Sequence, residues 1–305
     1  MKYSILGCGF IGTNLLINLL QSAKEGDKIQ VLDRSFKNVD AFYPFYSEAQ
    51  KRGVIVHLYH YEGKDFLKEN NTLVLDFFED SIVFNLMAIV GVQNWSQDQF
   101  NSYQKNKEIN DLIIPYLPKV KKYIFASTSE VYGSGDKPFT EKSEFRLMNY
   151  DASGRGLYAL EKIQSELISR NAKSYVNVRL FNIIGKYQEK SKGVVPLFID
   201  KLKNDEPIKC SKDVRCFCDV RDCVNSMVIL AHNDFCGNIN ICNPENTLSM
   251  LELGEMLQEY LKSRSPIETY ETDGISLRKG DNTLLSKFYK MKYGILDTFK
   301  YILEK

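Results

Sequence analysis

The sequence predicts an α/β fold in which a doubly wound, mostly parallel sheet carries a smaller C-terminal lobe for the substrate. Three observations lead to this prediction. Short β-branched runs alternate with segments of helical apolar spacing through the first half of the chain. A glycine-rich turn directly follows the first run. From Gly185 the alternation loosens, as expected where a second lobe begins, and 305 residues are enough for two interlocked lobes.

The expected elements follow from these periodicities. Strands of the main sheet are expected at Lys2–Leu6, Lys28–Asp33, Val54–Tyr59, Ser81–Leu86, Tyr123–Ser127 and Val176–Phe181. Helices between them are expected at Ile11–Ala23, Gln97–Leu117 and Leu157–Asn171. The later elements are expected to be a helix Val194–Leu202, a strand Ile208–Phe217, a helix Asp222–His232, a strand Gly237–Ile241 and a helix Ser249–Lys262. We expect a cofactor domain at 1–182 and a substrate lobe at 183–305, with residues of about 216–245 packing back on the first domain.

The charge balance narrows the classes of partner. Lys and Arg number 40 against 39 Asp and Glu, so no global field attracts nucleic acid or an anionic membrane. No apolar run approaches the roughly 20 residues that span a bilayer. The seven cysteines form no paired metal-binding motif, and we expect reduced thiols and no metal. A cytoplasmic protein is therefore expected.

The segment Gly7-Cys8-Gly9-Phe10-Ile11-Gly12 predicts a dinucleotide site, because it ends the first strand and opens the first helix. Glycines there allow a tight turn and close approach of backbone N–H groups to a pyrophosphate. Asp33 ends the next strand, about 20 residues after the last glycine, where its carboxylate can bind the adenosine ribose and repel a 2′-phosphate. A Rossmann-like domain that binds NAD rather than NADP is therefore expected.

Tyr158 and Lys162 lie four residues apart and are expected on one helical face. A cation near a phenol lowers its pKa, which would make Tyr158 a better general base toward a sugar hydroxyl. The hydroxyl-rich segment Ala126–Gly133 follows the fifth strand, at the sheet edge where ligands of parallel sheets bind. These two segments together predict a catalytic site.

With these motifs the chain resembles the extended short-chain dehydrogenase/reductase family, whose members modify nucleotide sugars. The resemblance spans nearly the whole chain. It rests on the Gly7–Gly12 loop, Asp33, Gly63–Asp65, Thr128–Gly133, Tyr158 with Lys162, Arg179–Asn182 with Gly185, Arg215–Asp222, Asn240–Asn243 and Arg278–Asp281. It implies a nucleoside-diphosphate sugar as substrate and a homodimer formed through a four-helix bundle of the helices Gln97–Leu117 and Leu157–Asn171. The apolar residues of these helices are equally explained by packing on the sheet.

The resemblance also implies the roles of individual residues. Thr128 and Tyr158 would contact the reacting hydroxyl, Lys162 would hold the nicotinamide ribose and Asp65 would reach the adenine. The implied cofactor contacts are Gly7, Gly9, Phe10, Ile11, Gly12, Asp33, Asp65, Leu86, Tyr158 and Lys162. The implied substrate contacts are Thr128, Ser129, Asn182, Arg215 and Arg278.

Within the family, the segments Ser127–Gly133, Arg215–Asp222, Ile241–Asn246, Glu252–Leu257 and Arg278-Lys279 resemble the UDP-glucuronic acid decarboxylase domain of a bacterial polymyxin-resistance enzyme. That resemblance implies a catalytic set of Thr128, Glu130, Tyr158, Lys162 and Arg278 and a reaction that begins with oxidation at C4. Decarboxylation is the leading interpretation. A 4-epimerase, a 4,6-dehydratase, a 4-keto-sugar reductase and a non-catalytic nucleotide-binding regulator remain alternatives.

Overall fold

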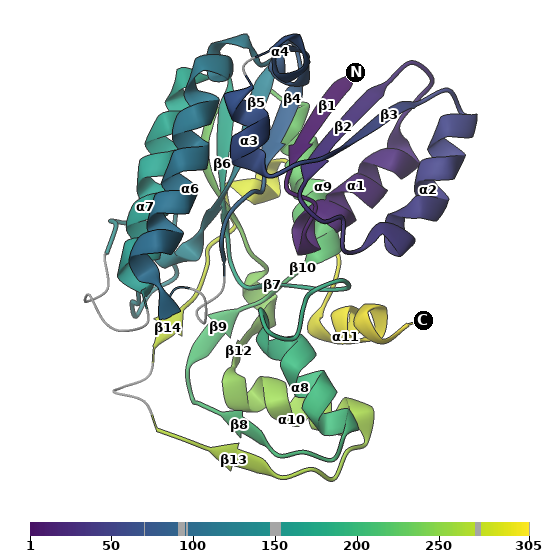
Figure 1. Ribbon diagram of the computed structural model, residues 1–305. Coiled ribbons are helices and arrows are strands. Elements are labelled where there is room, and N and C mark those ends of the chain that lie inside the picture. Colours follow the sequence, from purple (N-terminus) through teal and green to yellow (C-terminus); the bar gives the residue numbers. More distant parts are fainter. Residues whose placement is uncertain (70, 91–94, 96, 147–153, 272–275, 305) are drawn as a thin grey trace.

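The computed structural model describes residues 1–69, 71–90, 95, 97–146, 154–271 and 276–304 (Figure 1). Its centre is a seven-stranded sheet in the order β11-β6-β5-β4-β1-β2-β3, with every pair of neighbours parallel. The strands are β1 (Lys2–Leu6), β2 (Lys28–Asp33), β3 (Ile55–His60), β4 (Ile82–Asn85), β5 (Lys122–Thr128), β6 (Tyr175–Leu180) and β11 (Gly237–Ile241). The order winds outward in both directions from β1 and β4, which confirms the predicted doubly wound fold.

Alternating side chains divide the core between the two faces of this sheet. Tyr3 and Ile5 of β1 belong to the apolar cluster on one face, whereas Leu6 belongs to the cluster on the other. In β2, Ile29 and Val31 contrast with Leu32 in the same way. Both faces are therefore covered, which explains why the strands read as nearly continuous apolar runs.

Helices cover the sheet on both sides (Figure 1). The first face carries α1 (Phe10–Ser22), α2 (Val39–Lys51) and α9 (Val220–Ala231). The second carries α3 (Gly63–Lys68), α4 (Thr72–Phe78), α6 (Gln99–Ile113) and α7 (Arg155–Ile168), of which α6 and α7 lie side by side. The helix expected at Gln97–Leu117 gives way at Ile114 to a 3₁₀ segment, Ile114–Lys119, because Pro115 has no N–H for the helical ladder.

The second lobe has its own core. The helices α8 (Val194–Lys203), α10 (Met250–Leu261) and α11 (Ile295–Leu303) pack around Phe198, Leu253 and Phe299. The strand expected at Ile208–Phe217 is divided into β8 (Ile208–Cys210) and β9 (Val214–Cys216). A turn separates them, in which the Asp213 N–H donates to the Ser211 hydroxyl at 3.3 Å.

Two small sheets connect the lobes. In one, β9 lies between β12 (Thr247–Ser249) and β14 (Leu277–Arg278), and in the other β7 (Ile183–Ile184) pairs with β10 (Cys218–Asp219). Between these elements the chain returns to the first domain, because β11 pairs with β6 and α9 packs against α1. The segment after β5 also pairs with the segment after β14, where the Phe139 N–H donates to the Lys279 carbonyl at 2.8 Å.

Within the described part of the chain, no helix is both long and apolar enough to cross a membrane. Among the same residues, no group of three or more His, Cys, Asp and Glu side chains could hold a metal ion. All seven cysteines are free thiols, and only Cys236 is exposed.

A buried ion pair fastens α7 to the sheet. Arg179 of β6 is 1% exposed, and its Nε and Nη2 donate to the two carboxylate oxygens of Glu166 at 2.9 and 2.7 Å. The Ser127 hydroxyl donates to the same carboxylate at 2.6 Å. Two-point pairing satisfies both charges away from water and fixes the position of α7 relative to β5 and β6.

Glu166→Gln is expected to destabilise the fold by about 3–5 kcal/mol, because it leaves the Arg179 guanidinium buried without a counter-charge. The matched control is Glu268→Gln, which removes a surface ion pair with Lys209 at 3.5 Å. The control should change stability by less than about 0.5 kcal/mol. Urea denaturation of both variants measures the difference. Equal denaturation midpoints would show that the buried ion pair contributes no more to stability than the surface ion pair.

Candidate functional site

The glycine-rich turn lies between β1 and α1, as the sequence predicts. Gly7 has φ +94°, and a Cβ there would lie 3.1 Å from the Met87 backbone nitrogen. A Cβ on Gly12 would lie 2.1 Å from the Gly7 carbonyl oxygen, whereas a Cβ on Gly9 would meet no atom within 4 Å. Gly7 and Gly12 are therefore required by the turn itself. Gly9 leaves open space at the N-terminus of α1, where backbone N–H groups favour an anion.

The other cofactor candidates gather at the same edge of the sheet. Asp33 ends β2, and its carboxylate accepts hydrogen bonds from the Cys8 N–H at 2.7 Å and the Ser35 N–H at 2.8 Å. Leu86 follows β4 and donates its N–H to the Leu6 carbonyl at 2.8 Å. Asp65 lies in the first turn of α3. These positions, together with the space at Gly9, fit a dinucleotide lying across the carboxyl ends of β1, β2 and β4.

Tyr158 and Thr128 meet where β5 ends. The Tyr158 phenol is hydrogen-bonded to the Thr128 side chain, and its ring centroid lies 5.2 Å from that of Trp95. Lys162 is 2% exposed, and its ammonium lies 4.8 Å from the centroid of the Phe125 ring and 5.8 Å from that of Tyr158. The structure therefore brings together the three catalytic candidates of α7 and β5.

The pKa of Tyr158 shifts in the direction opposite to the sequence expectation. Burial of the hydroxyl raises the pKa of Tyr158 well above its usual range, and the negative charges of Glu161 and Glu130 raise it further, although part of the residue is exposed. The ammonium of Lys162 faces aromatic rings and lies 3.8 Å from the Glu161 carboxylate. In the protein alone the phenol is thus protonated at neutral pH and suited to donate a hydrogen bond.

Glu130 and Arg278 form an ion pair across 148 residues of sequence. The Arg278 Nε also donates to the Gly133 carbonyl at 3.1 Å. One oxygen of Glu130, Oε2, and one nitrogen of Arg278, Nη2, are buried without a hydrogen-bond partner in the described residues. Because an unpartnered buried polar atom costs free energy, these two atoms are candidates for contact with a polar group of a ligand.

Two further arginines extend this charge cluster. Arg215 donates from Nη1 to the carbonyls of Val214 at 2.9 Å and Ser276 at 2.7 Å, and lies 3.5 Å from the Asp213 carboxylate. Burial, followed by the charges of Arg278 and Arg155, lowers the pKa of Arg215 to about 10. Arg155 was missed by the sequence reasoning. Its position one helical turn before Tyr158 is the signal that would have found it.

The two remaining substrate candidates are Asn182, which bonds to the second lobe, and Ser129, which is buried. The Asn182 amide donates to the Cys216 carbonyl at 3.2 Å, so it ties the segment after β6 to β9. Ser129 is 5% exposed at the start of the 3₁₀ turn Ser129–Tyr132. The substrate candidates thus come from both lobes. Arg215 of β9 and Arg278 of β14 are direct pairing partners on neighbouring parallel strands.

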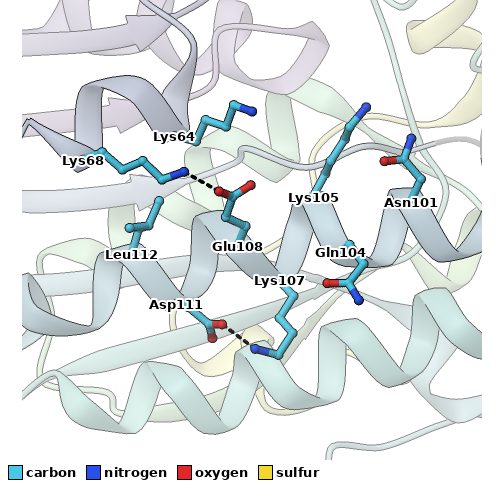
Figure 2. Close-up of a pocket in the computed structure, with 9 residues that line it drawn as sticks. All are labelled: Lys64, Lys68, Asn101, Gln104, Lys105, Lys107, Glu108, Asp111 and Leu112. Carbon is cyan, nitrogen blue, oxygen red and sulfur yellow. Dashed lines mark hydrogen bonds and ion pairs between the residues drawn. The ribbon is translucent and has the colours of Figure 1, made fainter.

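A hollow of about 600 Å³ lies elsewhere, on the surface between α3 and α6 (Figure 2). It is lined by Lys64, Lys68, Asn101, Gln104, Lys105, Lys107, Glu108, Asp111 and Leu112. Its acids are paired with its lysines, Lys68 to Glu108 at 2.6 Å and Lys107 to Asp111. The hollow shares no residue with the candidate site.

Comparison with known proteins agrees with this geometry. The model of the NAD dependent epimerase/dehydratase family matches residues 4–242. A curated relative, the UDP-N-acetyl-α-D-glucosaminuronate decarboxylase of Bacillus cytotoxicus, is 27% identical over 271 residues, which cover 86% of this chain and 80% of the relative.

Two solved structures of similar fold are each 20% identical to this chain with a TM-score of 0.80. One is the UDP-glucuronic acid 4-epimerase of Bacillus cereus in complex with UDP-glucuronic acid and NAD, matched over 99% of this chain and 98% of that one. The other is the dTDP-glucose 4,6-dehydratase of Streptomyces venezuelae with NAD bound, matched over 99% and 96%.

Gly12→Ala is expected to destabilise the protein by about 1–3 kcal/mol, because the new Cβ overlaps the Gly7 carbonyl and the turn must move. Gly9→Ala is the matched control, since its Cβ enters open space, and it should change stability by less than about 0.5 kcal/mol. Thermal unfolding of both variants tests the contrast. Equal losses at the two positions would contradict the steric role of Gly12.

Proposed function

Because the chain belongs to the NAD-dependent epimerase/dehydratase family and is therefore an NAD-dependent enzyme of nucleotide sugars, we propose that it oxidises a UDP-uronate at C4 and releases the sugar carboxylate as CO₂. The observation that carries this proposal is the pair of Glu130 and Arg278, each with a buried atom open to a ligand. The curated relative supports it, because its name describes the decarboxylation of such a substrate.

The cluster around Arg278 suits an acidic sugar. The positive charges of Arg278 and Arg155 act on Arg215, and that of Arg155 acts on Arg278, while Glu130 and Asp213 supply negative charge to both Arg215 and Arg278. Arginine binds carboxylate and phosphate oxygens through paired donors. In a chain of net charge +1, Arg215 and Arg278 supply the local guanidinium groups that a diphosphate or a uronate needs.

The chemistry assigned to the chain's residues has two steps. Tyr158, as its phenolate, would remove the proton of the C4 hydroxyl while Thr128 holds the oxygen. Bound NAD would supply the hydride acceptor, and its positively charged nicotinamide would favour the phenolate, which the protein alone does not. The resulting ketone lies β to the C5 carboxylate, so the C5–carboxyl bond breaks and its electron pair moves into the ketone oxygen. Thr128 and Tyr158 donate hydrogen bonds to that oxygen, and Tyr158 with its raised pKa is suited to this second role. Because the Glu130 carboxylate is ionised in its pair with Arg278, it would take a proton from water and pass it to C5.

The cofactor contacts follow from the same proposal. Asp33 binds the adenosine ribose hydroxyls, the turn Gly7–Gly12 approaches the pyrophosphate, Asp65 reaches the adenine, Leu86 flanks the dinucleotide and Lys162 binds the nicotinamide ribose. The support is their common position at the carboxyl edge of the sheet, together with the open space at Gly9. A carboxylate at Asp33 favours NAD over NADP because it repels a 2′-phosphate.

Product mass distinguishes the proposed reaction from its relatives. The purified protein is incubated with NAD and, in turn, UDP-glucuronic acid, UDP-N-acetylglucosaminuronic acid, dTDP-glucose and GDP-mannose. Loss of CO₂ from a uronate supports decarboxylation, whereas loss of water indicates a 4,6-dehydratase and unchanged mass with altered stereochemistry indicates an epimerase. Either of the latter outcomes would replace the proposal.

Variants of the site separate its two steps. Tyr158→Phe should lower C4 oxidation about 10²- to 10⁴-fold, because it removes the base of the first step. Glu130→Gln should retain slow oxidation but stall before the change at C5, so that reduced nicotinamide or a 4-keto intermediate accumulates. Reduced-nicotinamide absorbance and product mass are recorded together. A Tyr158→Phe enzyme as fast as wild type would refute the catalytic assignment.

A homodimer through α6 and α7 is part of the proposal. Phe100 of α6 is 67% exposed and Leu167 of α7 is 55% exposed, whereas Ile109, Leu112 and Ile113 pack against the sheet. Sedimentation equilibrium at micromolar concentration is expected to give twice the monomer mass of 35.2 kDa. A monomer there, or a Leu167→Lys variant that stays fully dimeric, would count against this surface.

A further inference from the structure

Glu161 is a buried carboxylate at the centre of the candidate site. It lies between Tyr158 and Lys162 on α7, and it is 1% exposed. Its Oε1 accepts hydrogen bonds from Asn110 at 3.0 Å and Ser165 at 2.8 Å. Its Oε2 accepts one from Asn106 at 3.4 Å and lies 3.8 Å from the Lys162 ammonium. Within the described residues, Lys162 is the one cation at ion-pair distance from this carboxylate.

The same hydrogen bonds reach the segment after β4. The Asn106 side chain accepts from the Ile89 N–H at 2.7 Å and donates to the Ile89 carbonyl at 3.3 Å. Asn110 accepts from Asn85 at 3.3 Å, the last residue of β4. The Trp95 indole also donates to the Ile89 carbonyl, at 3.0 Å, and Trp95 packs on Tyr158. Glu161 therefore connects Lys162 to the backbone that follows β4.

The negative charge of Glu161 limits where the Lys162 ammonium can lie. The ammonium of Lys162 is buried, and its other neighbours are the faces of Phe125 and Tyr158. Cation–π contacts of this kind contribute about 0.5–2 kcal/mol and do not fix one position. A carboxylate held by three neutral donors is a fixed negative charge, and it limits where the ammonium can lie.

We propose that Glu161 is a positioning residue, whose carboxylate holds the Lys162 ammonium and, through Asn106, the Ile89 backbone in the arrangement that receives the nicotinamide ribose. This inference rests on the proposed role of Lys162 at the cofactor. Glu161 touches neither cofactor nor substrate in this assignment and acts through Lys162. A purely structural role would instead lower the stability of the fold and leave cofactor affinity in the folded protein unchanged.

A double-mutant cycle on NAD affinity tests the inference without a known sugar substrate. Glu161→Gln keeps the shape and removes the charge, and calorimetry should show about tenfold weaker NAD binding, the usual scale for loss of a charged contact. Lys162→Met should weaken binding to a similar degree. Because Glu161 acts through Lys162, the double variant should bind no more weakly than Lys162→Met alone.

Ser165→Ala is the matched control, since it removes one hydrogen bond to the same carboxylate and leaves its charge. Its NAD affinity should stay within about twofold of wild type. If Lys162→Met weakens binding but Glu161→Gln does not, or if the two losses multiply in the double variant, the inference is wrong. If Lys162→Met binds NAD like wild type, the proposed role of Lys162 at the cofactor is wrong, and the inference on Glu161 loses its basis.

Lys162→Met leaves a buried charge uncompensated and can prevent folding. The double variant buries no net charge at this pair, so it should unfold at a higher temperature than Lys162→Met and allow the affinity to be measured. A double variant no more stable than Lys162→Met would contradict the pairing itself.

Discussion

The inward face of α7 is polar, and the rest of the site depends on this constraint. Glu161, Lys162, Ser165 and Glu166 are all at least 95% buried, although a helix against a sheet normally turns apolar residues inward. Each buried charge must find its partner, and the partners come from β6, α6 and β5. An apolar helix could slide by a fraction of a turn at modest cost. α7 cannot shift in this way, because the shift would separate the buried carboxylates of Glu161 and Glu166 from their partners Lys162 and Arg179.

The main sheet could be predicted from the sequence because its information is local. Short runs of apolar, often β-branched side chains mark the strands, and glycine marks the turn after the first strand. For α7, local periodicity does not predict which side chains are buried. Leu167 of this helix is exposed, which suits the expected dimer contact and not packing on the sheet, whereas the acids Glu161 and Glu166 are buried. Sequence periodicity treats a charged residue as solvated, and only the partners from distant strands reverse that assignment.

The candidate site was predictable in its motifs but not in its pairings. Pairs of closely spaced residues can be predicted from the sequence, as for Tyr158 with Lys162 and Thr128 with Glu130. The ion pair of Glu130 with Arg278 joins residues 148 positions apart, and it forms because the segment after β5 pairs with the segment after β14. The expected effect of Lys162 on Tyr158 was wrong in the unliganded protein for a related reason. Burial and the negative charge of Glu161, a residue to which the sequence analysis gave no role, raise the pKa of the Tyr158 phenol.

The two lobes meet through charged side chains that do not satisfy all of one another's polar atoms. Arg278 and Arg215 stand on neighbouring strands of the second lobe, and burial and the positive charge of Arg278 lower the pKa of Arg215. Glu130 from the first domain pairs with Arg278, but within the described part of the chain the Arg278 Nη2 and the Glu130 Oε2 have no hydrogen-bond partner. An anionic ligand at this point would satisfy the nitrogen and stabilise both arginines, and a ligand hydroxyl would satisfy the oxygen. The acidic sugar proposed as substrate carries both kinds of group, so it would satisfy both atoms.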